Sequence, residues 1–197
     1  KKIGTWDARV EACPDFAEVI TDATEQPRQR PPRRTQRRWA SGKRKRHTIK
    51  TQLTVTRRGR VLRIRRSVPG RTHDDTLFQW DKTAQRLPAH ARHYVDRGDD
   101  GAQTDHPDRQ VLVPVKKRRN HRVLTRAERR GNRRLARIRI GVEHVLSRLK
   151  KYQGPAQVYR HRIADDHRRF RNIAALVNFR LAPARDVISP WAIVQQV

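Results

Sequence analysis

Hydrophobic and polar residues alternate over short stretches in the first half of the chain, which is typical of β-strands. Residues 16–22 are apolar and β-branched and end on the carboxylate of Asp22. Residues 47–56 and 60–66 are two further runs of this kind, and Gly59 between them suits the turn of a hairpin. The pattern therefore predicts three strands, the last two of which pair directly.

The segment between the first strand and the hairpin has no such pattern. Residues 26–46 contain prolines and crowded arginines without a periodic apolar face. We therefore expect a loop that contacts phosphate. Trp39 lies within this loop and could either stack on an unpaired base or anchor the loop on the core.

Three short elements are predicted in the middle of the chain. Residues 74–82 can form a helix, with Thr72 as its N-cap. Residues 92–95 and 111–115 have the composition of strands. The proline at position 114 favours the edge or the end of a sheet, because proline cannot donate a ladder hydrogen bond.

Two amphipathic helices follow. In residues 125–152 apolar side chains recur at helical spacing, at Leu135, Ile138, Val142, Val145, Leu146 and Leu149. Residues 166–181 form a second helix of the same kind. Strand, hairpin, helix, two strands and two helices, in that order, favour an α/β fold in which helices flank a mixed sheet.

Length and charge narrow the possible functions. A chain of 197 residues suffices for one domain, which we assign to residues 16–181, with an N-terminal linker at 1–15 and a C-terminal tail at 182–197. The formal net charge is +29. Nucleic acid is the expected polyanionic partner, and a membrane is not, because no apolar stretch approaches the roughly 20 residues that span a bilayer.

Cysteine content bears on the compartment. Cys13 is the only cysteine, so the chain has no internal disulfide, and no secretory hydrophobic region opens it. We therefore expect an intracellular protein, located in the cytoplasm or nucleoid if the host is bacterial.

Three carboxylates are conspicuous in so basic a chain. Asp22 and Asp96 each follow an apolar strand, and Glu143 lies within the main helix. Such acids could hold two Mg²⁺ ions about 4 Å apart, an arrangement that activates water and stabilises the leaving oxygen in phosphodiester cleavage. Alternatively, each acid is simply the ion-pair partner of an arginine.

The main helix also carries a polar stripe. Asn132, Arg139, Glu143 and Lys150 fall near one face at helical spacing. In an isolated helix this stripe would be the solvated face. Beside a metal site, Arg139 and Lys150 would instead suit a surface that holds phosphates.

Local motifs follow one another in a family order along residues 16–181. They occupy residues 22–27, 29–31, 41–50, 70–74 and 96–98, and they end with the stripe from Asn132 to Lys150 that contains residues 142–144. Together they resemble the insertion-sequence transposases of the DDE superfamily, including their Harbinger-like relatives.

The resemblance implies a ribonuclease H-like fold whose acidic triad is Asp22, Asp96 and Glu143. It implies two Mg²⁺ or Mn²⁺ ions, nicking of double-stranded DNA at the ends of the insertion sequence, and attack of the freed 3′ hydroxyl on target DNA. It also implies an oligomer on DNA, because two ends must be paired. The alternative is a non-catalytic nucleic-acid-binding protein, such as a decayed or repurposed transposase.

Further residues are assigned to supporting roles around this triad. The basic residues expected to hold the DNA backbone are Lys43, Arg44, Lys45, Arg46, Lys50, Arg139 and Lys150. The expected accessory residues are His73, Asp74 and Asn132. For His73 and Asp74 the first expectation is that they fix the start of the helix after the hairpin.

Overall fold

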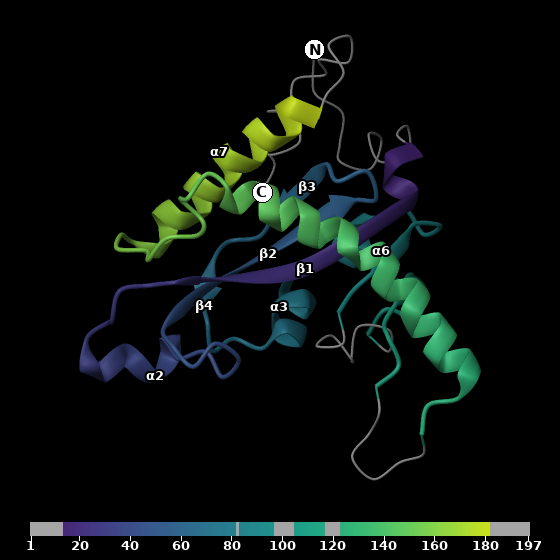
Figure 1. The fold of residues 1–197 in the computed structure, drawn as a ribbon, viewed down its shortest axis with the longest axis horizontal. Helices are drawn as coiled ribbons and strands as arrows, with labels where there is room; N and C mark the ends of the chain where they lie inside the picture. Colours follow the sequence, from purple (N-terminus) through teal and green to yellow (C-terminus); the bar gives the residue numbers. More distant parts are fainter. Residues whose placement is uncertain (1–13, 82, 97–104, 117–122, 182–197) are drawn as a thin grey trace.

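The computed structural model describes residues 14–81, 83–96, 105–116 and 123–181. Cys13, the tail and almost all of the predicted linker lie outside these residues. The described part is a mixed α/β structure built on a six-stranded sheet (Figure 1). The predicted mixed sheet with flanking helices is therefore confirmed.

Parallel and antiparallel pairs are combined in the sheet. Its strands are β1 (Glu18–Pro27), β2 (Thr48–Thr56), β3 (Val61–Ile64), β4 (Val68–Pro69), β5 (Arg92–Tyr94) and β6 (Gln110–Leu112). The order across the sheet is β3-β2-β1-β5-β6, and β4 pairs with β2. β1 is antiparallel to β2 and parallel to β5, and β5 is parallel to β6. Among the described residues β6 is an edge strand, and it ends at Leu112, before Pro114 and short of the predicted residue 115.

The first strand is longer than its apolar pattern predicted. It was expected to end at Asp22, but β1 runs on to Pro27 because its antiparallel pairing with β2 continues through the pair Pro27 and Thr48. Its parallel pairing with β5 stops at Ile20 and Tyr94. Beyond Ile20 the β5 side of β1 therefore has no neighbouring strand among the described residues, and Asp22 lies in the middle of the strand.

Turns and short helices refine the other predictions. The hairpin is confirmed, and Gly59 has a φ of 85°, a left-handed conformation that favours glycine. The expected loop contains η2 (Arg33–Thr35) and α2 (Gln36–Trp39). The guanidinium of Arg28 lies 3.8 Å from the centre of the Trp39 ring, so this half-buried indole anchors the loop to the end of β1.

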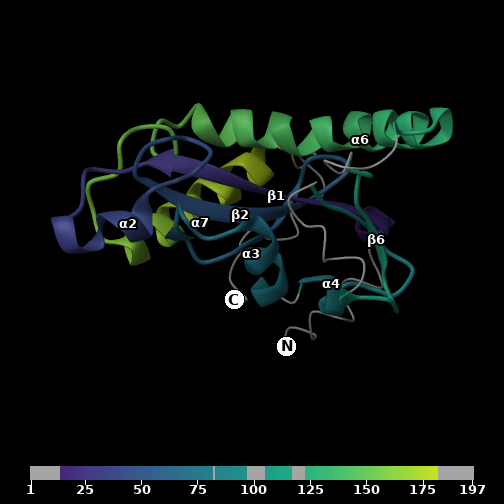
Figure 2. The ribbon, with the colours of Figure 1, turned by 90° about the horizontal axis from the view of Figure 1, so that it is seen from below.

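Helices cover both faces of the sheet (Figure 2). One face carries α6 (Arg126–Lys150), which contacts β1 and β5, and α7 (Ile163–Leu181), which contacts β3. The opposite face carries α3 (Asp74–Asp81) and α4 (Thr83–Arg86). The largest core cluster lies beneath α6 and α7, and its buried residues include Ile20, Leu53, Tyr94, Val142, Val145 and Phe170.

The helix boundaries follow local chemistry. Thr125 caps α6 by accepting a hydrogen bond from the backbone N–H of Glu128, whose side chain accepts one from the Thr125 N–H in return. Thr72 was expected to cap α3, but the cap is His73, whose Nδ1 accepts a hydrogen bond from the Asp75 N–H. The Thr72 carbonyl instead accepts a hydrogen bond from Lys50.

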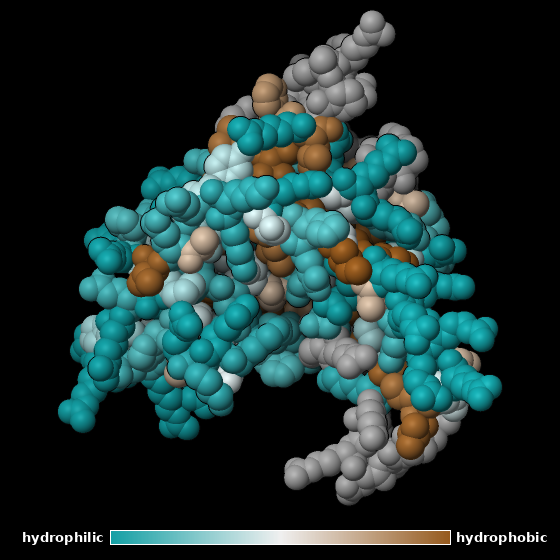
Figure 3. All heavy atoms as spheres, viewed as in Figure 1, coloured by the Kyte–Doolittle hydropathy of each residue, from teal (hydrophilic) through white to brown (hydrophobic). Residues whose placement is uncertain are grey.

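Polar side chains dominate the surface. The face over which α6 and α7 run is mostly hydrophilic, with isolated hydrophobic patches (Figure 3). Within the described residues, no helix has the length and apolar character needed to cross a membrane.

Candidate active site

Strand register brings the first two predicted acids together. Ile20 on β1 pairs with Tyr94 on β5, and both belong to the core beneath α6. Side chains two positions apart in a strand share a face. Asp22 lies two residues farther along β1 and Asp96 lies two residues beyond the end of β5, and both line one cleft on the face covered by α6.

The third acid comes from that helix. Glu143 lies one residue beyond the buried Val142, on the exposed side of α6. It lines the same cleft, of about 240 Å³, as Asp22 and Asp96. The other charged residues that line this cleft are Glu25, Lys43, Arg44, Lys50, Asp74, Arg139 and Lys150. The structure thus gathers all three acids and five of the seven predicted DNA-binding residues around one cleft.

Asp22 has the most perturbed carboxyl of this cleft. Burial raises its pKa to about 6, and the neighbouring carboxylate of Asp96 adds to the rise. The Ala23 N–H, which donates to Asp22 Oδ1 at 2.8 Å, opposes the rise, as do the charges of Arg139 and Lys43. A group that is costly to ionise in the free protein gains from a cation nearby, so Asp22 suits a metal ligand.

Asp96 is engaged by a cation of the protein itself. Arg139 Nη1 lies 2.8 Å from Asp96 Oδ1, and the side chains are 17% and 32% exposed. The Arg139 Nε is buried without a hydrogen-bond partner. The sequence allowed each acid to be simply the ion-pair partner of an arginine, and Asp96 has such a partner. It also lines the cleft that Asp22 and Glu143 share.

Metal geometry is incomplete in this arrangement. Across the described ranges, no three His, Cys, Asp or Glu side chains lie close enough together to hold one ion. The donor set nevertheless has the right chemistry, because three carboxylates from β1, the end of β5 and α6 line one cleft and hard divalent ions prefer oxygen ligands. Binding would require Arg139 to leave Asp96 and Glu143 to turn inward.

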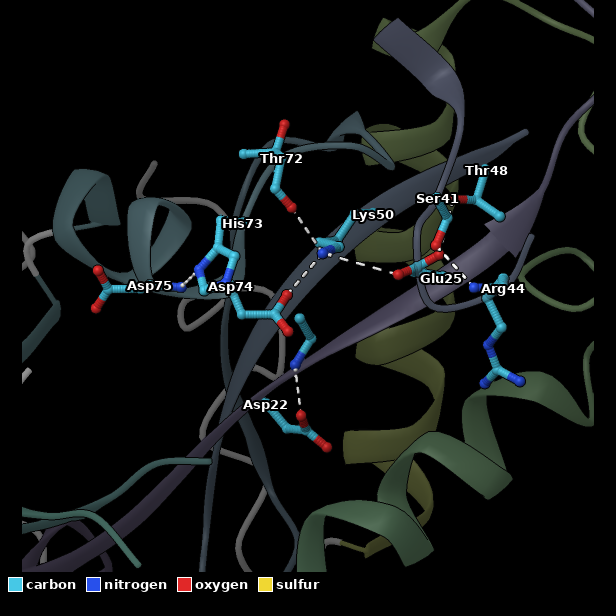
Figure 4. Close-up of polar contacts among 11 residues, drawn as sticks. Asp22, Glu25, Ser41, Arg44, Thr48, Lys50, Thr72, His73, Asp74 and Asp75 are labelled. Atoms are coloured by element: carbon cyan, nitrogen blue, oxygen red, sulfur yellow. Dashed lines mark hydrogen bonds and ion pairs between the residues drawn. The ribbon is translucent and has the colours of Figure 1, made fainter. Parts of the chain in front are cut away.

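Lys50 makes contacts other than those predicted. Its side chain is buried, and its ammonium donates to Asp74 Oδ1 and to the Thr72 carbonyl, each at 2.7 Å (Figure 4). Glu25 Oε1 lies 3.7 Å away. Lys50 was expected to hold DNA, but its ammonium is bonded to groups of the protein itself. It connects β2 to the start of α3 beside the cleft.

Glu25 lines the cleft but was not among the site residues expected from the sequence. It is largely buried, accepts a hydrogen bond from Thr48 Oγ1 at 2.8 Å and faces Lys50. Its place in the motif of residues 22–27 was the available signal, because three positions along a strand from Asp22 its side chain points to the opposite face. The strand was expected to end before it, so its side chain could not be assigned to the site.

Other predicted residues lie around or outside the cleft. Lys45 and Arg46 are exposed on the loop before β2 and do not line the cleft, unlike Lys43 and Arg44. Burial lowers the pKa of Lys150, and Arg44 lowers it further, whereas Asp22 raises it.

Two of the accessory residues also fall outside the cleft. His73 is exposed and caps α3, as its first expectation had it. The Asn132 side chain bonds to both the backbone N–H and the carbonyl of Val115. It therefore ties α6 to the segment that follows β6.

Comparison with known proteins shows the family of the chain. The family described as DDE superfamily endonuclease matches residues 21–178. A probable transposase for insertion sequence element IS702 from Microchaete diplosiphon is 33% identical over 168 residues, which are 83% of this chain and 57% of that protein. The chain thus spans little more than half the length of this relative. No solved structure matches it.

Proposed function

The chain belongs to the DDE superfamily endonucleases, and from this premise we propose that residues 16–181 are the catalytic domain of an insertion-sequence transposase that cuts and joins DNA. One observation carries the proposal, namely that Asp22, Asp96 and Glu143, from three separate elements, line one cleft ringed by basic side chains. The strand order, with β2 antiparallel and β1, β5 and β6 parallel, supports a ribonuclease H-like fold.

The three acids would hold two Mg²⁺ or Mn²⁺ ions. When bound, such ions lower the pKa of an attacking water and stabilise the leaving oxygen. Asp22 is fixed within β1 and Asp96 lies two residues beyond the end of β5, whereas the exposed Glu143 could turn from α6 toward them. Glu143 would therefore complete the metal site by turning inward when the ions and DNA bind.

Basic residues on the rim would position the phosphodiester. Lys43 and Arg44 approach the cleft from the loop before β2, and Arg139 and Lys150 approach it from α6. A phosphate offers Arg139 a bidentate partner in place of Asp96. DNA binding would thereby release Asp96 at the moment when the substrate is in place.

The reaction has two steps in this proposal. Water first attacks a phosphorus at the end of the insertion sequence, and the bond from phosphorus to the 3′ oxygen breaks, which leaves a 3′ hydroxyl. That hydroxyl then attacks a phosphorus in target DNA and displaces another 3′ oxygen. Because two ends must be joined to one target, we expect an oligomer on double-stranded DNA.

A nicking assay on supercoiled plasmid with Mg²⁺ or Mn²⁺ tests the proposal. Asp22→Asn, Asp96→Asn and Glu143→Gln should each abolish nicking while DNA binding persists. Asp108→Asn is the matched control, because Asp108 is 70% exposed, pairs with Arg109 and does not line the cleft. Its nicking should equal that of the unchanged protein, and EDTA should stop both.

The same assay distinguishes the non-catalytic alternative. A protein that binds DNA tightly but nicks it with neither Mg²⁺ nor Mn²⁺ would be a nucleic-acid-binding protein only. Nicking that survives in the three acid variants would overturn the assignment of the triad.

A further inference from the structure

A second recess lies farther along β1 from the catalytic cleft. It has a volume of about 650 Å³ and lies between the end of β1, the loop before β2 and the turn that joins α6 to α7. The residues that define it are Gln26, Arg46, Tyr159, Arg160, His161 and Arg169. We refer to it as the cationic groove.

The cationic groove differs in charge from the cleft, whose lining combines acidic and basic side chains. Five carboxylates line the cleft, at Asp22, Glu25, Asp74, Asp96 and Glu143, beside five lysines and arginines. Three arginines and one histidine line the groove, and among the described residues no Asp or Glu does. A recess with this lining attracts anions and repels cations. The cleft therefore offers carboxylate ligands for metal ions, whereas the groove offers only cations for a polyanion.

The floor of the groove is rigid. Gln26 is buried, and its Nε2 donates to the carbonyls of Gly154 and Gln157 at 2.6 and 2.7 Å. The backbone of Tyr159 bonds to Pro27 and Gln29. These contacts fix the turn after α6 to the end of β1, so the groove is formed before any ligand arrives.

The rim presents its cations to solvent. Arg46, Arg160, His161 and Arg169 are all exposed. The Arg169 guanidinium lies 5.6 Å from the centre of the buried Tyr159 ring, and the His161 ring lies 5.7 Å from it, edge to face. The aromatic floor thus holds part of the rim in place, which limits the entropy lost when an anion binds.

We propose that the cationic groove binds the DNA backbone a few nucleotides from the phosphodiester cut in the cleft. Asp22 and Gln26 are four residues apart on β1, a rise of about 13 Å at about 3.3 Å per residue. This separation spans only a few phosphates of one DNA strand, which are spaced by roughly 3.4 Å along the duplex axis and by more along the strand itself. The position relative to the cut rests on the proposed function, whereas the binding of the backbone does not.

The loop before β2 connects the two recesses. Its Lys43 and Arg44 line the cleft, and its Arg46 lines the groove. A DNA strand that follows this loop would contact both recesses. This continuity favours one DNA molecule across both recesses.

Salt-dependent binding to a 30-base-pair duplex tests the groove without requiring cleavage. In a plot of log K against log salt the slope is negative, and each lost phosphate contact reduces its magnitude by about 0.9. Arg160→Gln with Arg169→Gln should therefore reduce the magnitude of the slope by about 1.8, and Arg160→Lys should leave it unchanged. The control pair, Arg66→Gln with Arg168→Gln, removes the same charge from exposed positions outside both recesses. An equal fall in the control pair, or no fall in the groove pair, would overturn the proposal.

Replacing single phosphates by neutral methylphosphonates shows which phosphate the groove contacts. In a series of duplexes that each carry one methylphosphonate, at successive positions up to about four nucleotides from the cut, one position should weaken binding to the Asp22→Asn protein several-fold. The same substitution should cause no further loss once Arg160 and Arg169 are glutamine. A loss that persists in that variant would assign the contact to other residues. If the protein does not cut DNA, the salt slopes still decide whether the groove binds the backbone.

Discussion

Arg139 connects the two roles assigned to the cleft. It neutralises Asp96 in the free protein, and we expect it to compete with a metal ion for that carboxylate. Arg139→Gln should therefore bind Mn²⁺ several-fold more tightly in the absence of DNA, because a positive charge next to the site is gone. The same variant should cut DNA at least tenfold more slowly, because it lacks the phosphate ligand.

Titration of Mn²⁺ binding and the nicking assay together check this prediction. Arg109→Gln is the control, because it removes an arginine from an exposed aspartate outside the cleft. Weaker or unchanged Mn²⁺ binding by Arg139→Gln would show that the ion pair does not hold back the metal.

His93 makes stability depend on pH. It is buried in β5 against Phe78 of α3, its Nε2 lies 2.7 Å from Thr21 Oγ1, and burial lowers its pKa to about 3. The unfolded chain, with an ordinary pKa near 6.5, binds the proton more readily below that pH. The neutral histidine therefore stabilises the fold fully above about pH 6.5, and this contribution is lost as the pH falls toward 3.

Unfolding in urea between pH 7.5 and 4.5 measures this effect. The slope that His93 contributes approaches about 1.4 kcal/mol per pH unit. His93→Gln keeps a polar group for Thr21 but does not titrate, so its free energy of unfolding should fall less steeply with acid. Parallel curves for the two proteins would contradict a depressed pKa at His93.

Asparagine side chains bond to both backbone groups of a residue at two places in the fold. Asn178 on α7 bonds to the N–H and the carbonyl of Val61 at 2.8 and 2.7 Å, and it is 3% exposed. Val61 begins β3, which is the edge strand on that side of the sheet. Asn132 on α6 makes the same pair of bonds to Val115, but it is partly exposed.

The two asparagines form a matched pair of tests. Asn178→Ala leaves two backbone groups buried without partners, at about 1 to 3 kcal/mol each, so unfolding should become easier by about 2 to 6 kcal/mol. Asn132→Ala should cost less than about 1 kcal/mol, because water can replace its bonds. Chemical denaturation of both variants provides the comparison. Equal losses would mean that burial does not decide the strength of this contact.

The elements could mostly be predicted because their signals are local. The periodicity that predicted residues 125–152 matches α6, and Thr125 proves to be its cap. The end of β1 could not be predicted, because residues 23–27 are mostly polar and their strand conformation comes from pairing with β2. The same holds for α2, where Arg28 and Trp39 meet only in the folded chain.

The candidate site was predictable to the level of its elements. Acids at the ends of neighbouring strands were expected to converge, and Asp22, Asp96 and Glu143 do line one cleft. The partners of Lys50 and Asp96 could not be foreseen, since they depend on side chains brought together from distant segments. Sequence patterns therefore located the cleft but not the ion pairs within it.

Charge acts on the molecule as a whole. A formal net charge of +29 on 197 residues makes the folded chain repel itself more strongly than the expanded unfolded chain does. Screening shortens the reach of this repulsion, from about 30 Å at 0.01 M salt to about 8 Å at 0.15 M. We therefore expect the melting temperature to rise by several degrees when NaCl increases from about 0.01 to 0.15 M.

DNA should stabilise the fold further, because it binds the folded surface and neutralises it at the same time. The increment from a duplex in low salt should exceed that from NaCl alone, and added NaCl should then reduce it, because salt competes for the same arginines. Calorimetry with and without a 30-base-pair duplex separates the two effects, and sucrose at matched osmolality controls for exclusion of solute. A melting temperature that falls with NaCl in the absence of DNA would mean that ion pairs such as the one between Arg139 and Asp96 outweigh the repulsion of the excess arginines.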